Sequence, residues 1–206
     1  MAENERPQIY LITPPEFELE RFADQLAGLL DVVDVACVRL ALSSRDEERI
    51  LRAGDALRAL THARDVALVI QEHVNMVTRL GLDGVHLGDG AKSVRQSRGV
   101  LGRDAIIGAY CATSRHSGIN AAEAGADYVS FGPLAAAGLG DGQIADPALF
   151  SWWSEMIEVP VVAEGNLDEE RLTTLSSKTD FFAFGPEVWN AADPVATLRN
   201  FDRLIG

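Results

Sequence analysis

The sequence predicts an α/β protein with the architecture of a (β/α)₈ barrel, with residues 1–206 forming a single domain. Short apolar runs rich in valine, isoleucine, phenylalanine and tyrosine occur eight times, and helical patterns lie between them. The runs mostly start about 25 residues apart, which fits one strand, one helix and two short loops. Eight such units close a barrel, while an open doubly wound sheet is the alternative.

The expected elements follow one another in a regular order. Pro14-Pro15 ends the first run, and a helical pattern follows it. After the sixth run, residues 134–146 are rich in glycine and small residues, which predicts a mobile loop; the sequence leaves open whether it is a lid or a plain connector. The expected strands are 8–13, 33–40, 66–70, 83–87, 105–110, 127–131, 159–163 and 180–184.

The composition bounds the classes of protein and partner. The net charge of −13 argues against a broad nucleic-acid or anionic-membrane surface, because both need clustered positive charge. The first residues show no signal-peptide pattern, and no apolar stretch reaches the length of a transmembrane helix. Cys37 and Cys111 have no CxxC spacing, which favours a reducing compartment without a zinc site. We therefore expect a cytoplasmic protein.

In a barrel of this kind, the site lies at the carboxyl ends of the strands. Glycines follow the seventh and eighth strands just before helices, an arrangement whose free backbone N–H groups can hold a phosphate. Gly165, Asn166 and Gly185 are the candidates, although Pro186 lacks an N–H and weakens the cradle. The alternative is that these glycines only permit tight turns.

Three carboxylates follow strands in the same region. Glu72, Asp89 and Glu164 could hold Mg²⁺ together with a substrate phosphate. Glu72 could equally pair with Arg39 across adjacent strand ends. His86 lies in an apolar strand with its side chain opposite those of its neighbours, so it is either a buried structural histidine or a base.

The chain resembles the thiamine phosphate synthase family, which includes the thiazole tautomerases. The resemblance implies a (β/α)₈ barrel that joins a hydroxymethylpyrimidine diphosphate to a thiazole phosphate, with release of pyrophosphate and assistance from Mg²⁺. DGVHLG and GADYVSFGP are the most specific segments. The segments that carry the resemblance are YLIT (10–13), LGLDGVHLG (80–88), IIGA (106–109), EAGADYVSFGP (123–133), VPVVAEGN (159–166) and DFFAFGPEVW (180–189).

Carried over position by position, the resemblance implies a role for each strand-end residue. The ligand would be a phosphorylated small molecule, with no nucleic-acid or membrane partner, and a homodimer is left open. The implied roles are catalysis by Glu72 and Arg39, substrate binding by Arg39, Gln71, Asp89, Tyr110, Gly165, Asn166 and Gly185, and Mg²⁺ binding by Glu72 and Asp89.

Several positions depart from the family pattern. Arg39 stands where synthases usually have glutamine, and Ser43 stands where they usually have lysine. Ala91 takes the place of the second metal carboxylate, for which Asp89 is a substitute. The loop at 135–140 has neither the threonine nor the lysine of the family. Each lost charged hydrogen bond is worth about 1.5–3 kcal/mol, so the grip on a diphosphate is weakened.

Two other functions therefore stay open. One is a binding or regulatory protein that holds a thiamine-related phosphorylated molecule without turnover. The other is a thiazole tautomerase-like isomerase, with Glu72, His86 or His116 as its base. Arg115 would replace a lost charge if its side chain faced the site.

Overall fold

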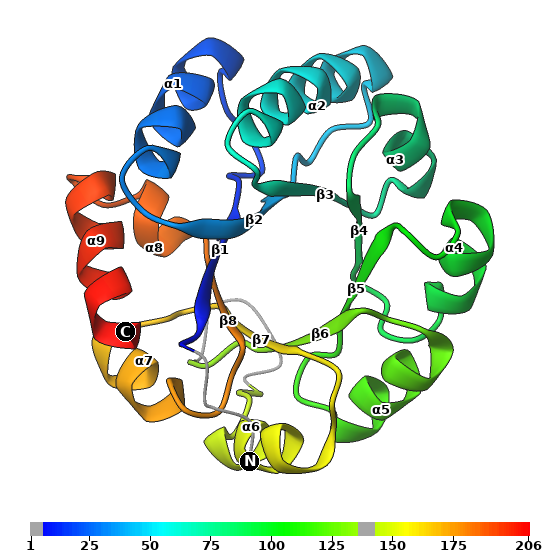
Figure 1. The fold of residues 1–206 in the computed structure, drawn as a ribbon, viewed down its shortest axis with the longest axis vertical. Coiled ribbons are helices and arrows are strands. Elements are labelled where there is room, and N and C mark those ends of the chain that lie inside the picture. Colours follow the sequence, from blue (N-terminus) through cyan, green and yellow to red (C-terminus); the bar gives the residue numbers. More distant parts are fainter. Residues whose placement is uncertain (1–5, 136–142) are drawn as a thin grey trace.

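The computed structural model describes residues 6–135 and 143–206. In this part of the chain, eight parallel strands close into a barrel in sequence order, and β8 pairs with β1 (Figure 1). This confirms the (β/α)₈ barrel and excludes the open sheet, which would leave two edge strands unpaired. The strands are β1 (Gln8–Ile12), β2 (Val35–Leu40), β3 (Ala67–Gln71), β4 (Gly84–Leu87), β5 (Ile106–Tyr110), β6 (Tyr128–Phe131), β7 (Val161–Glu164) and β8 (Phe181–Phe184).

The helices form an outer ring around the strands (Figure 1). Several begin at a carboxylate or hydroxyl that accepts first-turn N–H groups, as Asp46 does at α2 and Ser114 at α5. None of the described helices is long and apolar enough to cross a membrane. The helices are α1 (Leu19–Leu30), α2 (Glu47–His62), α3 (Val74–Leu80), α4 (Val94–Leu101), α5 (Arg115–Ala124), α6 (Pro147–Met156), α7 (Glu169–Leu175), α8 (Pro186–Trp189) and α9 (Pro194–Ile205).

The core has an outer and an inner part. The outer part lies between strands and helices, where Trp153 is fully buried against Phe131 and donates its indole N–H to the Val159 carbonyl at 2.7 Å. The inner part fills the barrel and includes Tyr128, whose ring occupies the space beside Gly108; a Cβ there would lie 2.0 Å from the ring. The barrel interior is therefore packed with side chains.

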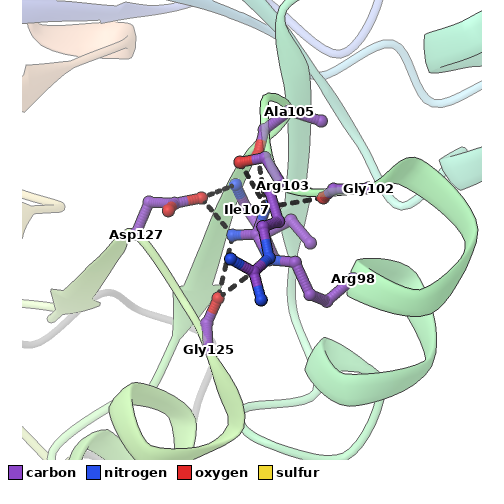
Figure 2. Close-up of polar contacts among 7 residues, drawn as sticks. All are labelled: Arg98, Gly102, Arg103, Ala105, Ile107, Gly125 and Asp127. Atoms are coloured by element: carbon purple, nitrogen blue, oxygen red, sulfur yellow. Dashed lines mark hydrogen bonds and ion pairs between the residues drawn. The ribbon is translucent and has the colours of Figure 1, made fainter.

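Aspartates tie neighbouring strands together at their amino ends. Asp83, Asp127 and Asp180 each precede an even-numbered strand and accept the N–H of a residue near the start of the preceding strand, at 2.6–2.7 Å. Asp127 also forms an ion pair with Arg98 of α4 (Figure 2). The Arg98 guanidinium donates further to the carbonyls of Ala105 and Gly125, at 2.7 and 2.9 Å. This end of the barrel is held by backbone-directed hydrogen bonds, as expected for its stability face.

The expected loop at 134–146 lies partly outside the described residues. Its two ends are described: Leu134 N–H donates to the Gly165 carbonyl at 2.9 Å, and Ala145 N–H donates to the Pro133 carbonyl at 2.8 Å. The first bond fastens one end of the loop to the residue after β7, and the second fastens the other end to the segment after β6. The expected mobility of the loop and its role as a lid stay predictions.

Candidate functional site

Polar side chains line the inside of the barrel at the carboxyl ends of the strands. Four of them follow a residue of the inner core by two positions, so strand alternation turns them inward, and the other two follow Gly84 and Gly108 in the same alternation. Most of these residues were predicted from their place at strand ends. The set is Arg39 on β2, Gln71 on β3, His86 on β4, Tyr110 on β5, Ser130 on β6 and Glu164 on β7.

A buried ion pair crosses this end of the barrel. Arg39 Nη1 lies 3.1 Å from Glu164 Oε2, and the side chains are 5% and 13% exposed. The expected alternative pairing of Arg39 with Glu72 is wrong, because barrel closure brings β7 within reach of the guanidinium. Although burial lowers the pKa of Arg39, Glu164 and the nearby tyrosines Tyr10 and Tyr128 raise it more, so Arg39 stays charged.

Below the ion pair, three side chains form a hydrogen-bonded chain. The hydroxyl oxygens of Tyr10 and Tyr128 lie 2.9 Å apart, and His86 Nδ1 lies 2.9 Å from the Tyr128 hydroxyl. Burial, and then the Arg39 charge, hold the pKa of His86 well below its ordinary value, so the imidazole is neutral at neutral pH. Burial also raises the pKa of both tyrosines. These contacts agree with the structural interpretation of His86.

The two expected Mg²⁺ ligands lie on the loops after β3 and β4. Glu72 Oε1 accepts the Gly88 N–H at 2.6 Å, and Asp89 Oδ2 accepts the Ser93 hydroxyl at 2.6 Å. A Cβ at position 88 would lie 2.6 Å from Glu72 Oε1, so any larger residue there would make the carboxylate shift. Each carboxylate is exposed and uses one of its oxygens in these bonds.

Glu72 and Asp89 fit a metal site that is completed by the substrate. The described residues contain no group of three or more acids, histidines or cysteines that could hold a metal ion by itself. Mg²⁺ is commonly bound by one or two carboxylates together with substrate phosphates and waters. Glu72 and Asp89 fit that arrangement, whereas Glu164, the third expected carboxylate, is paired with Arg39.

The expected phosphate cradle after β7 and β8 contains a carboxylate of the chain itself. Gly165 and Asn166 have positive φ angles, 86° and 59°, which turn the backbone sharply. The Gly185 N–H donates to Glu187 Oε2 at 2.9 Å, and the Leu167 N–H donates to Glu187 Oε1 at 3.1 Å. Glu187 thus bridges two backbone amides at a position where sequence analysis expected a ligand phosphate.

The remaining candidates lie at or beside the same rim. The Tyr110 hydroxyl donates to the Gly132 carbonyl at 2.8 Å, which fixes its ring at the end of β5. The Arg115 guanidinium lies 4.1 Å from the Trp152 ring centre, so it packs on α6. His116 contacts Asn120 one turn along its own helix, at 3.1 Å.

Several residues of the site were not predicted from the sequence. The roles of Tyr10, Tyr128, Ser130 and Glu187, and the pairing of Glu164 with Arg39, come from the structure. A signal was present for Tyr128 and Ser130, because polar groups at alternating positions of an apolar strand face the same side. The sequence shows no comparable signal for partners on opposite sides of the barrel.

Residues 9–185 match the family described as thiamine monophosphate synthase. The chain belongs to this family. A thiamine-phosphate synthase of Rhodospirillum centenum is 43% identical over 201 residues, covering 96% of this chain and 97% of the relative. Another from Erythrobacter litoralis is 35% identical over 216 residues, covering 100% and 99%.

Solved structures agree with the thiamine monophosphate synthase assignment at the level of fold. The thiamine phosphate pyrophosphorylase of Pyrococcus furiosus superposes with a TM-score of 0.80 at 22% identity, covering 98% of this chain and 99% of that one. A geranylgeranylglyceryl phosphate synthase of Thermoplasma acidophilum gives a TM-score of 0.72 at 15% identity, covering 97% and 93%. At such identities the likeness shows the fold alone.

Proposed function

We propose that this chain is a thiamine phosphate synthase, which joins hydroxymethylpyrimidine diphosphate to thiazole phosphate and releases pyrophosphate. The carbon–oxygen bond to the diphosphate breaks, and a carbon–nitrogen bond to the thiazole forms. The 43% identity to a thiamine-phosphate synthase over 96% of the chain carries this proposal. The polar rim at the carboxyl ends of the strands supports it, because barrel enzymes place their chemistry there.

Residues at different strand ends would bind different parts of the two substrates. Glu72 and Asp89 would hold Mg²⁺, which would neutralise charge on the departing diphosphate. Gln71 directly precedes Glu72, and its side-chain amide N–H group would donate to a diphosphate oxygen. Gly165 and Asn166 would bind the thiazole phosphate, and Tyr110 would form one wall of the substrate site. The buried free cysteines support a reducing, cytoplasmic location.

The proposal is tested by turnover of the Glu72→Gln variant. Glutamine keeps the size of the side chain but removes the charge that would bind Mg²⁺, so we expect kcat/KM to fall at least about 100-fold. Steady-state formation of thiamine phosphate with Mg²⁺ measures this. Glu48→Gln, an exposed acid on α2, is the matched control and should match the wild type. Equal turnover in wild type and Glu72→Gln would remove Glu72 from the mechanism.

Binding without turnover is the second candidate, and Glu187 is the observation that favours it. Its carboxylate already accepts the Gly185 and Leu167 amides, and a ligand phosphate would have to displace it or bind elsewhere. Thermal unfolding separates the two functions. A ligand at about 100 times its Kd adds about 2.7 kcal/mol to the free energy of unfolding. Stabilisation by thiazole phosphate or thiamine phosphate, with no product formed from the two substrates, would establish binding alone.

A further inference from the structure

The Arg39–Glu164 pair has buried polar atoms without hydrogen-bond partners. The 3.1 Å contact is an ion pair, but Arg39 Nε and Glu164 Oε2 make no hydrogen bond within the described part of the chain. Arg39 is 4% exposed, so its Nε is largely shielded from solvent. Native proteins leave few such atoms unsatisfied, and a binding site is one place where they persist.

The pair lies where the proposed function requires a substrate. Arg39 is the fifth of the six residues of β2, and Glu164 is the last residue of β7. Both side chains face into the barrel, two residues after Cys37 and Val162 of the inner core. The guanidinium also lies 5.7 Å from the ring centre of Tyr10, which limits its freedom on that side.

The charge of the pair decides which part of a substrate it suits. An arginine in a substrate-binding role would suit a diphosphate, but Glu164 neutralises the charge of Arg39 at 3.1 Å. A diphosphate approaching Arg39 would also meet the Glu164 carboxylate, and like charges repel. A neutral edge that offers an acceptor beside a donor would satisfy a guanidinium N–H and a carboxylate oxygen at once, without repulsion.

We propose that Arg39 and Glu164 together recognise the aminopyrimidine edge of the substrate. The guanidinium donates to a ring nitrogen, and the carboxylate accepts from the adjacent amino group. Arg39 and Glu164 are then specificity-determining residues for the ring, and the diphosphate is held by other groups. This inference rests on the proposed function, because it takes the pyrimidine as the ligand of this rim.

Two probes test the recognition without any diphosphate. The first is 4-amino-5-hydroxymethyl-2-methylpyrimidine, and the second is its 4-oxo counterpart, in which the donor and acceptor of that edge are exchanged. Ligand-detected NMR titration of the wild type should show the amino probe binding at least about ten-fold more tightly, since exchange leaves buried polar groups unpaired. Magnesium pyrophosphate is titrated in parallel.

The variant must remove both charges at once. A single substitution leaves one buried charge unpaired and destabilises the fold, whereas apolar residues of similar volume often replace a buried ion pair without loss. We therefore use Arg39→Met/Glu164→Leu, checked for folding by its thermal transition. The matched control is Arg64→Met/Asp31→Leu, which removes a more exposed ion pair between α1 and the turn after α2.

The expected result is that the double variant loses the amino-over-oxo preference and keeps its affinity for pyrophosphate, while the control retains both. Retention of the preference by the double variant would overturn the inference. So would a fall in pyrophosphate affinity with unchanged ring preference, which would make Arg39 a diphosphate anchor. A ring preference that depends on the pair in a protein without turnover would refute the proposed function and leave this inference standing.

Discussion

Single buried residues set the electrostatics of the barrel interior. Arg39 and Glu164 form a neutral pair, and Tyr10, Tyr128 and His86 form a hydrogen-bonded chain beneath it. Burial holds the tyrosines in the phenol form and the histidine in the imidazole form. Together these five side chains carry no net charge at neutral pH. The residues that neutralise charge on a substrate must therefore lie at the rim of the barrel, above them.

The lowered pKa of His86 predicts a pH dependence of stability. In the unfolded chain His86 titrates near 6.5, whereas in the fold it titrates lower, so the unfolded state binds more protons below that pH. The free energy of unfolding should therefore fall as the pH falls below about 6.5, by up to about 1.4 kcal/mol per pH unit from this group.

Chemical denaturation of wild type and His86→Gln between pH 7.5 and 5 measures this contribution. Glutamine retains a polar group but does not titrate, so the variant should lose less stability over that range. His116→Gln, at an exposed histidine, should behave as the wild type. Parallel pH profiles for wild type and His86→Gln would show that His86 is not held neutral by the fold.

Glu187 predicts a gain of function on substitution. Its carboxylate accepts the Gly185 and Leu167 amides beside Gly165 and Asn166, so it occupies donors of the proposed cradle and repels a phosphate bound there. Glu187→Gln removes the charge, and we expect thiazole phosphate to bind several-fold to about ten-fold more tightly by calorimetric titration. Glu170→Gln on α7 is the control. Unchanged or weaker binding in Glu187→Gln would mean that the phosphate lies elsewhere.

At the scale of elements, the strands were predictable and their partners across the barrel were not. Each apolar run became a strand within a few residues of its expected bounds, because buried parallel strands need continuous apolar sequence. Alternation could also indicate that Tyr128 and Ser130 face inward. The contact between Arg39 on β2 and Glu164 on β7 depends on closure of the barrel and on side-chain length, which local sequence patterns do not contain.

The loops show the same division. Glycines at 165 and 185 indicated sharp turns, and the structure has a turn at both strand ends. That Glu187 folds back onto the turns could not be inferred, because a glutamate in a first helical turn ordinarily points to solvent. Local backbone conformation could therefore be predicted from the sequence, whereas the side-chain contacts that determine the chemistry of the site could not.

At the amino ends of the strands, Arg98 predicts a stability effect without an effect on turnover. Its guanidinium bonds to Asp127 and to the carbonyls of Ala105 and Gly125, which joins α4 to the loops before β5 and β6 (Figure 2). Lysine keeps the charge but cannot make these contacts in parallel. Arg98→Lys should lower the free energy of unfolding by about 1–3 kcal/mol, or a few degrees in Tm, and leave kcat unchanged.

Arg95→Lys, an exposed arginine on the same helix, is the control for Arg98→Lys. Thermal unfolding of the two variants should differ, with Arg95→Lys matching the wild type. Equal Tm values would mean that the Arg98 contacts contribute no net stability. A lower kcat in a fully folded Arg98→Lys protein would mean that the two ends of the barrel are coupled.

At the scale of the whole molecule, the amino ends of the strands stabilise the barrel and the carboxyl ends carry the candidate site. Aspartates and Arg98 fasten the amino ends of the strands, where a cavity of about 270 Å³ between Tyr10, Cys37 and Phe181 is largely apolar. The carboxyl ends carry the ion pair, the two exposed carboxylates and the sharp turns. Departures from the family pattern gather at this second end, while the segments that build the barrel persist.

The central claim is that this divergent rim still performs the synthase reaction. The most direct measurement incubates the wild type with hydroxymethylpyrimidine diphosphate, thiazole phosphate and Mg²⁺, and quantifies thiamine phosphate and pyrophosphate in the same sample. We predict that the two products form in equal amounts and that their formation stops when Mg²⁺ is removed by a chelator. Pyrophosphate release without thiamine phosphate, or no product at saturating substrates, would contradict the claim.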